Sequence, residues 1–264
     1  IKIESDLVFK AHVFFSRITD RQGFFSTSAT KRLVRSIEHF NPDIIHLHNL
    51  HGYYLDIRVL FEFLRNYGKP VVWTLHDCWA FTGHCAYFSF AKCDKWKTGC
   101  GQCPQKTSYP ASFLLDDSKK SYNEKKRLFT GVENLNIVTP SNWLNKLVKE
   151  SFLGKFPVYT INNGVDLSVF HPVESDFKEK NNLRGKKIVL GIANVWEKRK
   201  GLNDFLTLSK LLSDDFKIVL VGLTEKQIAS LPSNIIGITR TANISELVEL
   251  YSAADVFVNP TMED

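Results

Sequence analysis

The sequence has 264 residues, of which 44% are hydrophobic, 23% charged and 12% aromatic. This length and composition are typical of two globular domains and exclude a single small module or a low-complexity protein. The formal net charge of +6 suits phosphate-bearing ligands or an anionic membrane surface, but equally an ordinary, slightly basic enzyme. The basic stretches are short and mixed with acids, which argues against a nucleic-acid groove. No apolar run reaches the ~18 residues of a membrane-spanning helix.

The first half of the sequence alternates short β-branched runs with longer amphipathic stretches. Helical spacing of apolar residues predicts helices at residues 27–40 and 57–68, the second of which ends at Gly68. A third helix is expected within residues 134–152, after a strand and a turn, with Ser141 as its N-cap. The other strands expected in this half lie at residues 42–49, 69–77 and 156–166.

The second half repeats this alternation. Strands are expected at residues 186–195, 216–222, 235–240 and 255–260, with helices between them at residues 202–213, 225–232 and 244–254. Strands separated by helices indicate parallel sheets, and the apolar runs at 218–222 and 255–260 are predicted to be buried on both faces. The polar segment 171–187 is predicted to link two α/β domains that meet at a cleft.

Ligands of parallel sheets bind at the carboxyl ends of the strands, so the residues after each strand are the candidates for function. In the first half these candidates are His46, His48, His51, His76 and Asp77. In the second half they are the residues from Asn194 to Gly201, then Gly222, Arg240, Glu263 and Asp264. Histidines and acids on one side and cations on the other suit the transfer of a group away from a phosphate leaving group.

The loop after the strand at 186–195 is the strongest candidate for a phosphate site. Arg199 and Lys200 precede Gly201 and a predicted helix, whose free N–H groups and partial positive charge favour an anion. Two cations there would neutralise a departing diphosphate. A solvated basic loop is the competing interpretation, because the glycine pattern of the standard nucleotide loops is missing.

The histidines of the first half allow more than one interpretation. His76 ends a predicted strand, where it could hydrogen-bond a sugar hydroxyl or polarise an acceptor, or serve as a structural histidine. His46, His48 and His51 suggest a metal site. However, side chains at i and i+2 of a strand share a face only in pairs, and His51 follows a turn, so the metal interpretation is the weaker one.

Several stretches resemble motifs of one enzyme family, the family 4 glycosyltransferases. Their interdomain signature is similar to INNGVDLSVFHP, their donor-phosphate loop to NVWEKRKGL, and the run that leads to their acidic donor motif to LVELYSAADVFVNPTMED. Two further segments resemble a bacterial subgroup of this family that builds surface polysaccharides. They are PDIIHLHNLHGYY, and TLHDCWAFTGHC with the CDKWKTGCGQCPQ that follows it. These motifs occur in the family's order over nearly the whole chain.

The resemblance implies a GT-B fold, in which two Rossmann-like parallel-sheet domains face a cleft. Residues 1–170 would form the acceptor-side domain, with a cysteine-rich loop at 78–104, and residues 171–264 the nucleotide-sugar domain, both incomplete. The only methionine is Met262, and the second acid of the donor motif would lie beyond residue 264. We therefore expect the sequence to be the middle of a longer protein.

The resemblance also implies a reaction. It is the retaining transfer of a sugar from a nucleotide-diphosphate donor to a hydroxyl on a lipid-linked or growing glycan, and it needs no metal for catalysis. By analogy, Lys200 binds the donor phosphate and Arg199 assists it. Arg199 would replace an arginine that the family carries where this sequence has Asn194. His76 matches the active-site histidine near the donor sugar and the acceptor.

The remaining donor contacts also follow from the analogy. Glu263 and Asp264 lie where the paired-acid motif begins, with Asp264 at the position of its first acid, and these acids would bind sugar hydroxyls and the ribose. Selectivity for the base is expected near Gly222 and Arg240. The implied location is the cytoplasm, with at most peripheral contact to the inner face of the membrane, and no nucleic-acid partner is expected.

All five cysteines fall between residues 78 and 103. The spacing of Cys85, Cys93, Cys100 and Cys103 ends in a C-x-x-C pair, which favours a structural zinc site. Reduced free thiols and disulfides are the alternatives, although an enzyme that uses cytosolic nucleotide-sugars should keep its thiols reduced. Cys78 is most simply a small buried hydrophobe. On each view the loop frames the acceptor side and does not carry out catalysis.

Two other functions fit parts of the sequence. A nucleotide-sugar 2-epimerase or a sugar phosphorylase would keep the same fold, but no residues are in evident position to move a C2 proton or to hold pyridoxal phosphate. A zinc-bearing module that binds nucleic acid or protein would use the lysines of the cysteine-rich loop. This function is less favoured, because such a module does not need two α/β domains.

Overall fold

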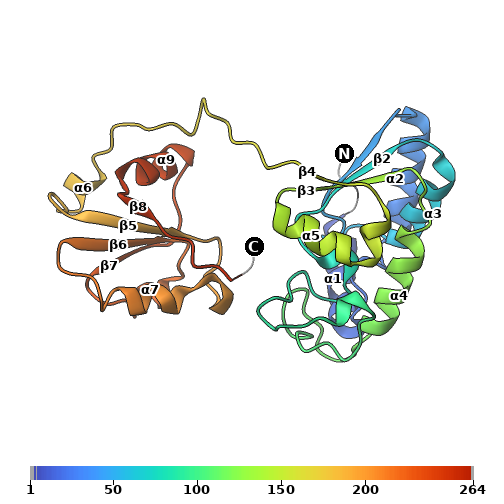
Figure 1. The fold of residues 1–264 in the computed structure, drawn as a ribbon, viewed down its shortest axis with the longest axis horizontal. Helices are drawn as coiled ribbons and strands as arrows, with labels where there is room; N and C mark the ends of the chain where they lie inside the picture. Colours follow the sequence, from blue (N-terminus) through green and yellow to red (C-terminus); the bar gives the residue numbers. More distant parts are fainter. Residues whose placement is uncertain (1–2, 4, 263–264) are drawn as a thin grey trace. The chain divides into compact units, whose positions relative to one another are not determined.

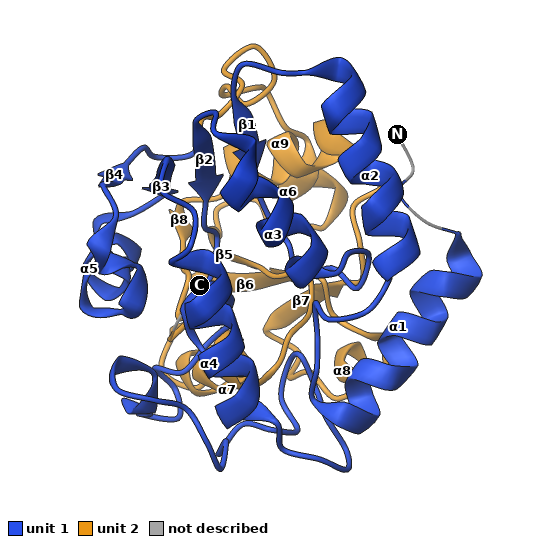
Figure 2. Cartoon of the chain, turned by 90° about the vertical axis from the view of Figure 1, so that its right-hand side faces the viewer, with its two compact units in different colours: residues 1–163 blue, residues 164–264 orange. Residues whose placement is uncertain are grey.

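The computed structural model describes residue 3 and residues 5–262. These residues form two compact units that divide between Asn163 and Gly164, and each unit contains a four-stranded parallel sheet (Figures 1 and 2). The predicted α/β class with two parallel sheets is confirmed. No helix of the described residues is both long enough and apolar enough to cross a bilayer.

The sheet of unit 1 has its strands in chain order. They are β1 (Ile45–Leu47), β2 (Val71–Thr74), β3 (Leu135–Thr139) and β4 (Val158–Thr160), and each pairs in parallel with the next. Trp73 on β2 lies opposite Leu47 on one side and Ile137 on the other. A parallel connection requires a crossover, which the helices supply.

The helices that accompany this sheet are α1 (Asp6–Thr19), α2 (Thr27–Phe40), α3 (Ile57–Tyr67), α4 (Ser118–Phe129) and α5 (Asn142–Glu150). The predictions of α2, α3 and α5 are confirmed. Gly68 ends α3 at a φ of 75°, and Ser141 caps α5 by accepting a hydrogen bond from the Leu144 N–H. Helices α1 and α4 were not predicted from the sequence pattern. The lysine-rich α4 buries Lys125 on the same side as Tyr122 and Phe129.

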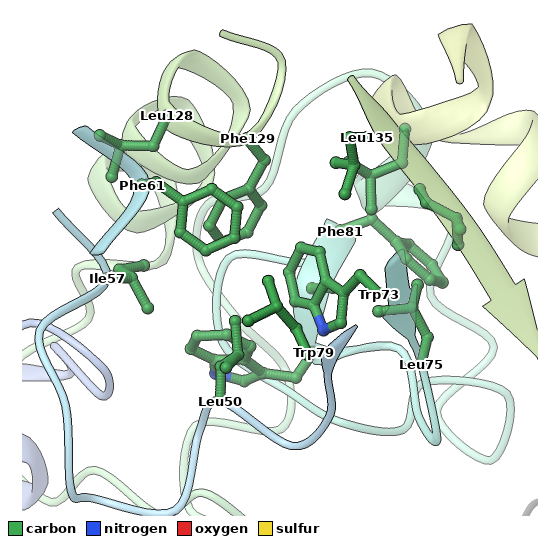
Figure 3. Packing of buried hydrophobic residues seen from close by; sticks show 14 of the residues in the cluster. Leu50, Ile57, Phe61, Trp73, Leu75, Trp79, Phe81, Leu128, Phe129 and Leu135 are labelled. Carbon is green, nitrogen blue, oxygen red and sulfur yellow. The ribbon is translucent and has the colours of Figure 1, made fainter. Parts of the chain in front are cut away.

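The core of unit 1 is built from aromatic side chains. Trp73 on β2 packs against Phe61 of α3 and Phe129 of α4, with ring centroids 5.4 and 5.0 Å apart (Figure 3). The same apolar cluster continues through the turn η1 (Trp79–Phe81) to Trp96 in the turn η2 (Lys95–Lys97). The cysteine-rich loop is therefore part of the main core and has no separate core of its own.

Unit 2 has the strands β5 (Lys187–Ile192), β6 (Phe216–Val221), β7 (Ile235–Ile238) and β8 (Val256–Phe257), in the order β7-β6-β5-β8. Its helices are α6 (Phe177–Lys180), α7 (Leu202–Leu208), α8 (Glu225–Ile228) and α9 (Ile244–Ala253). Phe205 of α7 packs on one face of the sheet and Leu250 of α9 on the other (Figure 1). This two-sided cover explains the continuous apolar runs of β5 and β6.

Two predictions about unit 2 are wrong in detail. The strand expected at 255–260 is not buried on both faces, because β8 pairs with β5 alone among the described residues and leaves Val256 and Phe257 nearly half exposed. The segment 171–187 is not simply a linker. Its Phe177 and Leu183 pack in the core of unit 2, since these two apolar side chains have a sheet face to cover.

Candidate functional site

The carboxyl ends of β1 and β2 bring three histidines together in unit 1. The two strands are parallel neighbours, so His48 and His76 follow them at the same edge of the sheet. His48 Nδ1 lies 3.1 Å from His76 Nε2, and the rings stack with centroids 5.4 Å apart. His46, whose ring centroid is 4.3 Å from that of His48, hydrogen-bonds the Thr74 hydroxyl at 2.8 Å. The predicted strand-end position of His76 is thus occupied by a cluster of imidazoles.

This clustering has an electrostatic consequence. Partial burial, together with the neighbouring His48, lowers the pKa of His46, because a second positive charge close by disfavours protonation. Within the pair of His48 and His76, one ring nitrogen has to donate and the other has to accept. His48 thus occupies one ring nitrogen of the half-buried His76.

His51 does not join this cluster. Its Nε2 lies 2.8 Å from Asp77 Oδ2, and its Nδ1 lies 3.2 Å from the hydroxyl of Tyr109. The other oxygen of Asp77 accepts a hydrogen bond from the Trp79 N–H at 2.9 Å. These contacts fix the turn that follows His76, so Asp77 and His51 position the candidate histidine. Sequence reasoning gave no sign of Tyr109, which is 58 residues from its partner.

The metal interpretation of His46, His48 and His51 gains no support. The structure separates His51 from the other two, and the described residues hold no group of three or more His, Cys, Asp or Glu side chains ready to bind a metal ion. His51 follows a turn and not a strand, and its side chain is directed to Asp77.

The candidate phosphate loop of unit 2 follows β5. It contains the turn η4 (Lys198–Lys200), and Gly201 at a φ of 77° leads into α7, which is shorter than predicted. The Nε of Arg199 is 2.7 Å from Glu197 Oε1, and both Arg199 and Lys200 are partly buried. This pair with Glu197 compensates part of the positive charge of the loop.

The loop lies against the last described residues of the chain. The carbonyl of Arg199 accepts hydrogen bonds from the Met262 N–H at 3.1 Å and from the Thr261 hydroxyl at 3.4 Å. A Cβ on Gly201 would come within 2.5 Å of Pro260, which shows how closely the two segments pack. Glu263 and Asp264 themselves lie outside the described residues. The structure thus brings the cationic loop to the segment directly before the two predicted acids.

Gly222 and Arg240 have different surroundings. Gly222 follows β6 at a φ of 96°, and a Cβ there would lie 1.6 Å from the carbonyl oxygen of Ala193, which follows β5. Glycine is needed at this position because two strand-end loops touch. Arg240 is exposed after β7, which β6 separates from β5, so the structure does not bring it to Arg199.

The four cysteines of the predicted metal set line one small cavity in unit 1, and all of them are free thiols. A hydrogen bond with Cys103 raises the pKa of the Cys85 thiol, and the same bond lowers the pKa of Cys103 to about 7. Burial raises the pKa of Cys100 to about 11. Cys78 is buried and does not line the cavity.

Comparison with known proteins connects these observations. The family model for Glycosyltransferase Family 4 matches residues 4–169, more than half of the chain. The chain belongs to Glycosyltransferase Family 4. The predicted resemblance is therefore confirmed, and the histidine cluster of β1 and β2 lies inside the matched region of this family 4 chain.

Two curated relatives carry transferase names. WcaC of Escherichia coli (strain K12), which is named as a colanic acid biosynthesis glycosyl transferase, is 31% identical over 160 residues, which are 58% of this chain and 38% of WcaC. The processive diacylglycerol alpha-glucosyltransferase of Acholeplasma laidlawii is 24% identical over 146 residues, which are 51% of this chain and 43% of that protein. The family 4 chain thus spans about two fifths of the length of these relatives.

Solved structures share the fold. Sucrose-phosphate synthase from Thermosynechococcus elongatus aligns with 89% of this chain and 55% of its own at a TM-score of 0.57 and 15% identity. Anabaena HepE in complex with UDP-glucose aligns with 88% of this chain and 56% of its own at a TM-score of 0.54 and 13% identity. These neighbours are GT-B glycosyltransferases, so the predicted GT-B class of the family 4 chain is confirmed.

Proposed function

We propose that this chain is part of a retaining glycosyltransferase. It would move a sugar from a nucleotide-diphosphate donor to a hydroxyl on a lipid-linked or growing glycan. Membership of family 4 and the transferase names of both curated relatives support the reaction class. The name of WcaC supports a role in polysaccharide synthesis, and the UDP-glucose bound to HepE supports a nucleotide-sugar donor. Because the proposed donor is a cytosolic nucleotide-sugar, the reaction would take place in the cytoplasm. The enzyme would contact the membrane at most peripherally, through its acceptor.

In this proposal unit 1 serves the acceptor and the reacting sugar. His76 is the residue proposed to hydrogen-bond the donor sugar or the acceptor hydroxyl, and its contact with His48 fixes the ring. A neutral imidazole can both donate and accept, which suits a hydroxyl partner. Asp77 and His51 act through the turn and are positioning residues.

Unit 2 serves the donor in this proposal. Lys200 and Arg199 would neutralise the diphosphate as it leaves, and Glu263 and Asp264 would bind sugar hydroxyls and the ribose. Fixed cations stabilise a departing diphosphate without a metal, so no cofactor is required for catalysis. Gly222 contributes by allowing the strand-end loops to approach, and Arg240 remains a candidate for contact with the base on the basis of its strand-end position alone.

The observation that carries the donor assignment is the contact of Arg199 with Thr261 and Met262. Family 4 motifs from two distant parts of the sequence, the phosphate loop and the run before the paired acids, meet there. A solvated basic loop would have no reason to be hydrogen-bonded to the segment that leads to the predicted acids.

A binding measurement on the full-length protein tests the assignment. A panel of nucleotide-diphosphate sugars is screened by thermal shift, and the affinity of the best donor is then measured by calorimetry. Replacing Lys200 by Ala should weaken donor binding by about tenfold to a hundredfold, because a charge-assisted hydrogen bond contributes about 1.5–3 kcal/mol.

Lys210→Ala is the matched control, since Lys210 is an exposed lysine of the same unit, eight residues beyond the start of α7. It should bind the donor like the wild type. Equal donor affinity for wild type and Lys200→Ala would remove the phosphate role from this loop.

A further inference from the structure

The cysteine-rich loop encloses a cavity of about 20 Å³, large enough for one water molecule or one ion. Cys85, Cys93, Cys100 and Cys103 all contribute to its wall, so residues spread over 19 positions of the sequence face a common space. Cys78 is not part of the wall. The cavity therefore brings together the four cysteines of the predicted metal set and leaves out the fifth.

One further side chain of the wall carries a polar atom without a partner: Trp96 Nε1 is buried and makes no hydrogen bond. His84, which also lines the cavity, bonds through one ring nitrogen to Asp20, whose second oxygen accepts a hydrogen bond from the Asp117 N–H at 3.0 Å. A backbone hydrogen bond with Ser108 also acts on the His84 ring, so the ring is held in place. Buried polar atoms seldom remain unsatisfied, so Trp96 Nε1 indicates a missing partner beside the cavity.

A buried cation lies close by. The Lys125 ammonium donates hydrogen bonds to the carbonyls of Trp79 at 2.8 Å and Thr82 at 3.2 Å, and it sits 3.4 Å from the centroid of the Trp79 ring. Thr82 is itself part of the cavity wall. Asp20 and Asp77 act on this ammonium electrostatically, without a direct ion pair among the described residues. Further negative charge close by would therefore stabilise the buried ammonium.

We propose that Cys85, Cys93, Cys100 and Cys103 bind one Zn²⁺ as thiolates in this cavity. Sulfur ligands select soft or borderline metals, and four of them form the closed tetrahedral set of a structural zinc site. Each cysteine binds as a thiolate, so binding releases up to four protons to solvent and leaves a zinc–thiolate centre of net charge −2. That charge adds to the compensation of Lys125, and a sulfur gives Trp96 Nε1 the partner that it lacks.

The sulfurs have to move inward when the metal binds. No three potential ligands of the described residues already stand in a metal-binding arrangement, although Cys85 and Cys103 are in hydrogen-bond contact. Cys93, Cys100 and Cys103 lie outside helices and strands and are only partly buried, so their side chains can turn. The zinc would cross-link distant parts of the loop that follows His76, a structural role that does not depend on the proposed transferase reaction.

Metal analysis of the full-length protein tests the proposal. The protein is expressed in zinc-supplemented medium, purified without chelators or metal-affinity resin, and its zinc content is measured by mass spectrometry. We expect one zinc ion per chain, its loss in Cys100→Ser, and its retention in Cys78→Ser, the matched control outside the cavity. Wild-type protein that contains no zinc and takes up none on titration would overturn the proposal.

A second measurement covers the case in which Cys100→Ser does not fold. Wild-type protein is stripped of metal under reducing conditions and titrated with Co²⁺, which should give the intense absorption of tetrahedral thiolate-bound cobalt, together with proton release. Thiols are also counted in the fresh, unreduced protein after denaturation with a chelator, and all five should react. Absence of the cobalt bands, or disulfides in place of free thiols, would contradict the zinc site.

Discussion

At the scale of single residues, two buried histidines of unit 1 have opposite environments. His12 Nδ1 bonds to the Ser26 hydroxyl at 2.7 Å, and its Nε2 accepts the Gly23 N–H at 3.4 Å, so the ring is neutral as it stands. Burial lowers the pKa of His12 to about 4. Burial also disfavours the charged form of His84, but the bond to Asp20 outweighs it and raises the pKa. Burial decides the charge of the His12 ring, whereas the bonded Asp20 carboxylate decides that of His84.

The depressed pKa of His12 predicts a loss of stability in acid. Between its ordinary value of 6.5 and the folded value of about 4, the unfolded chain binds a proton that the folded protein does not. The free energy of unfolding should therefore fall as the pH decreases through this window, by up to about 3 kcal/mol from this group alone.

Chemical unfolding at several pH values, followed by tryptophan fluorescence, measures this dependence. Other groups titrate in the same range, so the test is the difference between wild type and His12→Gln, which cannot take up the proton. The stability advantage of the wild type should shrink from pH 6.5 to pH 4. A constant difference across that range would contradict the assigned pKa.

At the scale of elements, the strand ends of unit 2 depend on one close contact. β5 and β6 are paired along their full length, and the chain leaves both at the same edge. Gly222 turns away from β6 with its Cα against the carbonyl of Ala193. The contact fixes where the loop to Arg199 begins, so packing at Gly222 determines the position of the candidate phosphate loop.

This contact predicts a large difference between two glycine substitutions. Gly222→Ala places a Cβ 1.6 Å from the Ala193 oxygen, whereas Gly185→Ala, at a similar positive φ of 74°, meets nothing within 4 Å. Gly185→Ala should cost about 1 kcal/mol of stability for its backbone conformation alone. Gly222→Ala should cost at least about 2 kcal/mol more, because the two backbone segments have to separate. Urea unfolding measures the free energy of unfolding of both variants. Equal losses of stability would show that the contact between Gly222 and Ala193 does not resist an added Cβ.

At the scale of the whole molecule, the chain consists of two units with separate cores. Each sheet carries its candidate residues at its own carboxyl edge, with histidines in unit 1 and cations in unit 2. A donor bound chiefly through its diphosphate should therefore protect amides of unit 2 from hydrogen exchange more strongly than amides of unit 1.

Hydrogen exchange of the full-length protein, with and without the nucleotide-diphosphate sugar that gives the largest thermal shift, tests this division. Amides at residues 197–202 and 260–262 should become protected, since the loop and the segment before the acids are hydrogen-bonded to each other. Amides of α9, on a helix that faces one side of the sheet, serve as the internal reference. Protection confined to unit 1 would place the donor elsewhere.

The sequence by itself determined the local framework of this protein. The alternation of apolar runs gave α2, α3, α5 and most strands, because helix and strand periodicities and caps such as Ser141 act over a few residues. It also identified His76, Arg199 and Lys200 as strand-end residues. Helix α4 was not predicted, because its buried side includes a lysine. The periodicity of apolar residues assigns a lysine to the solvent-exposed side.

Only the tertiary structure decided which of these residues meet. His51 turns to Asp77, His84 reaches Asp20 across 64 positions, and Lys125 lies under Trp79 from 46 positions away. Such pairs leave no periodic trace in the sequence, since they form only when the packing of the core brings distant segments together. The free energy that selects them is that of burying charge and polar atoms, which depends on every neighbour at once.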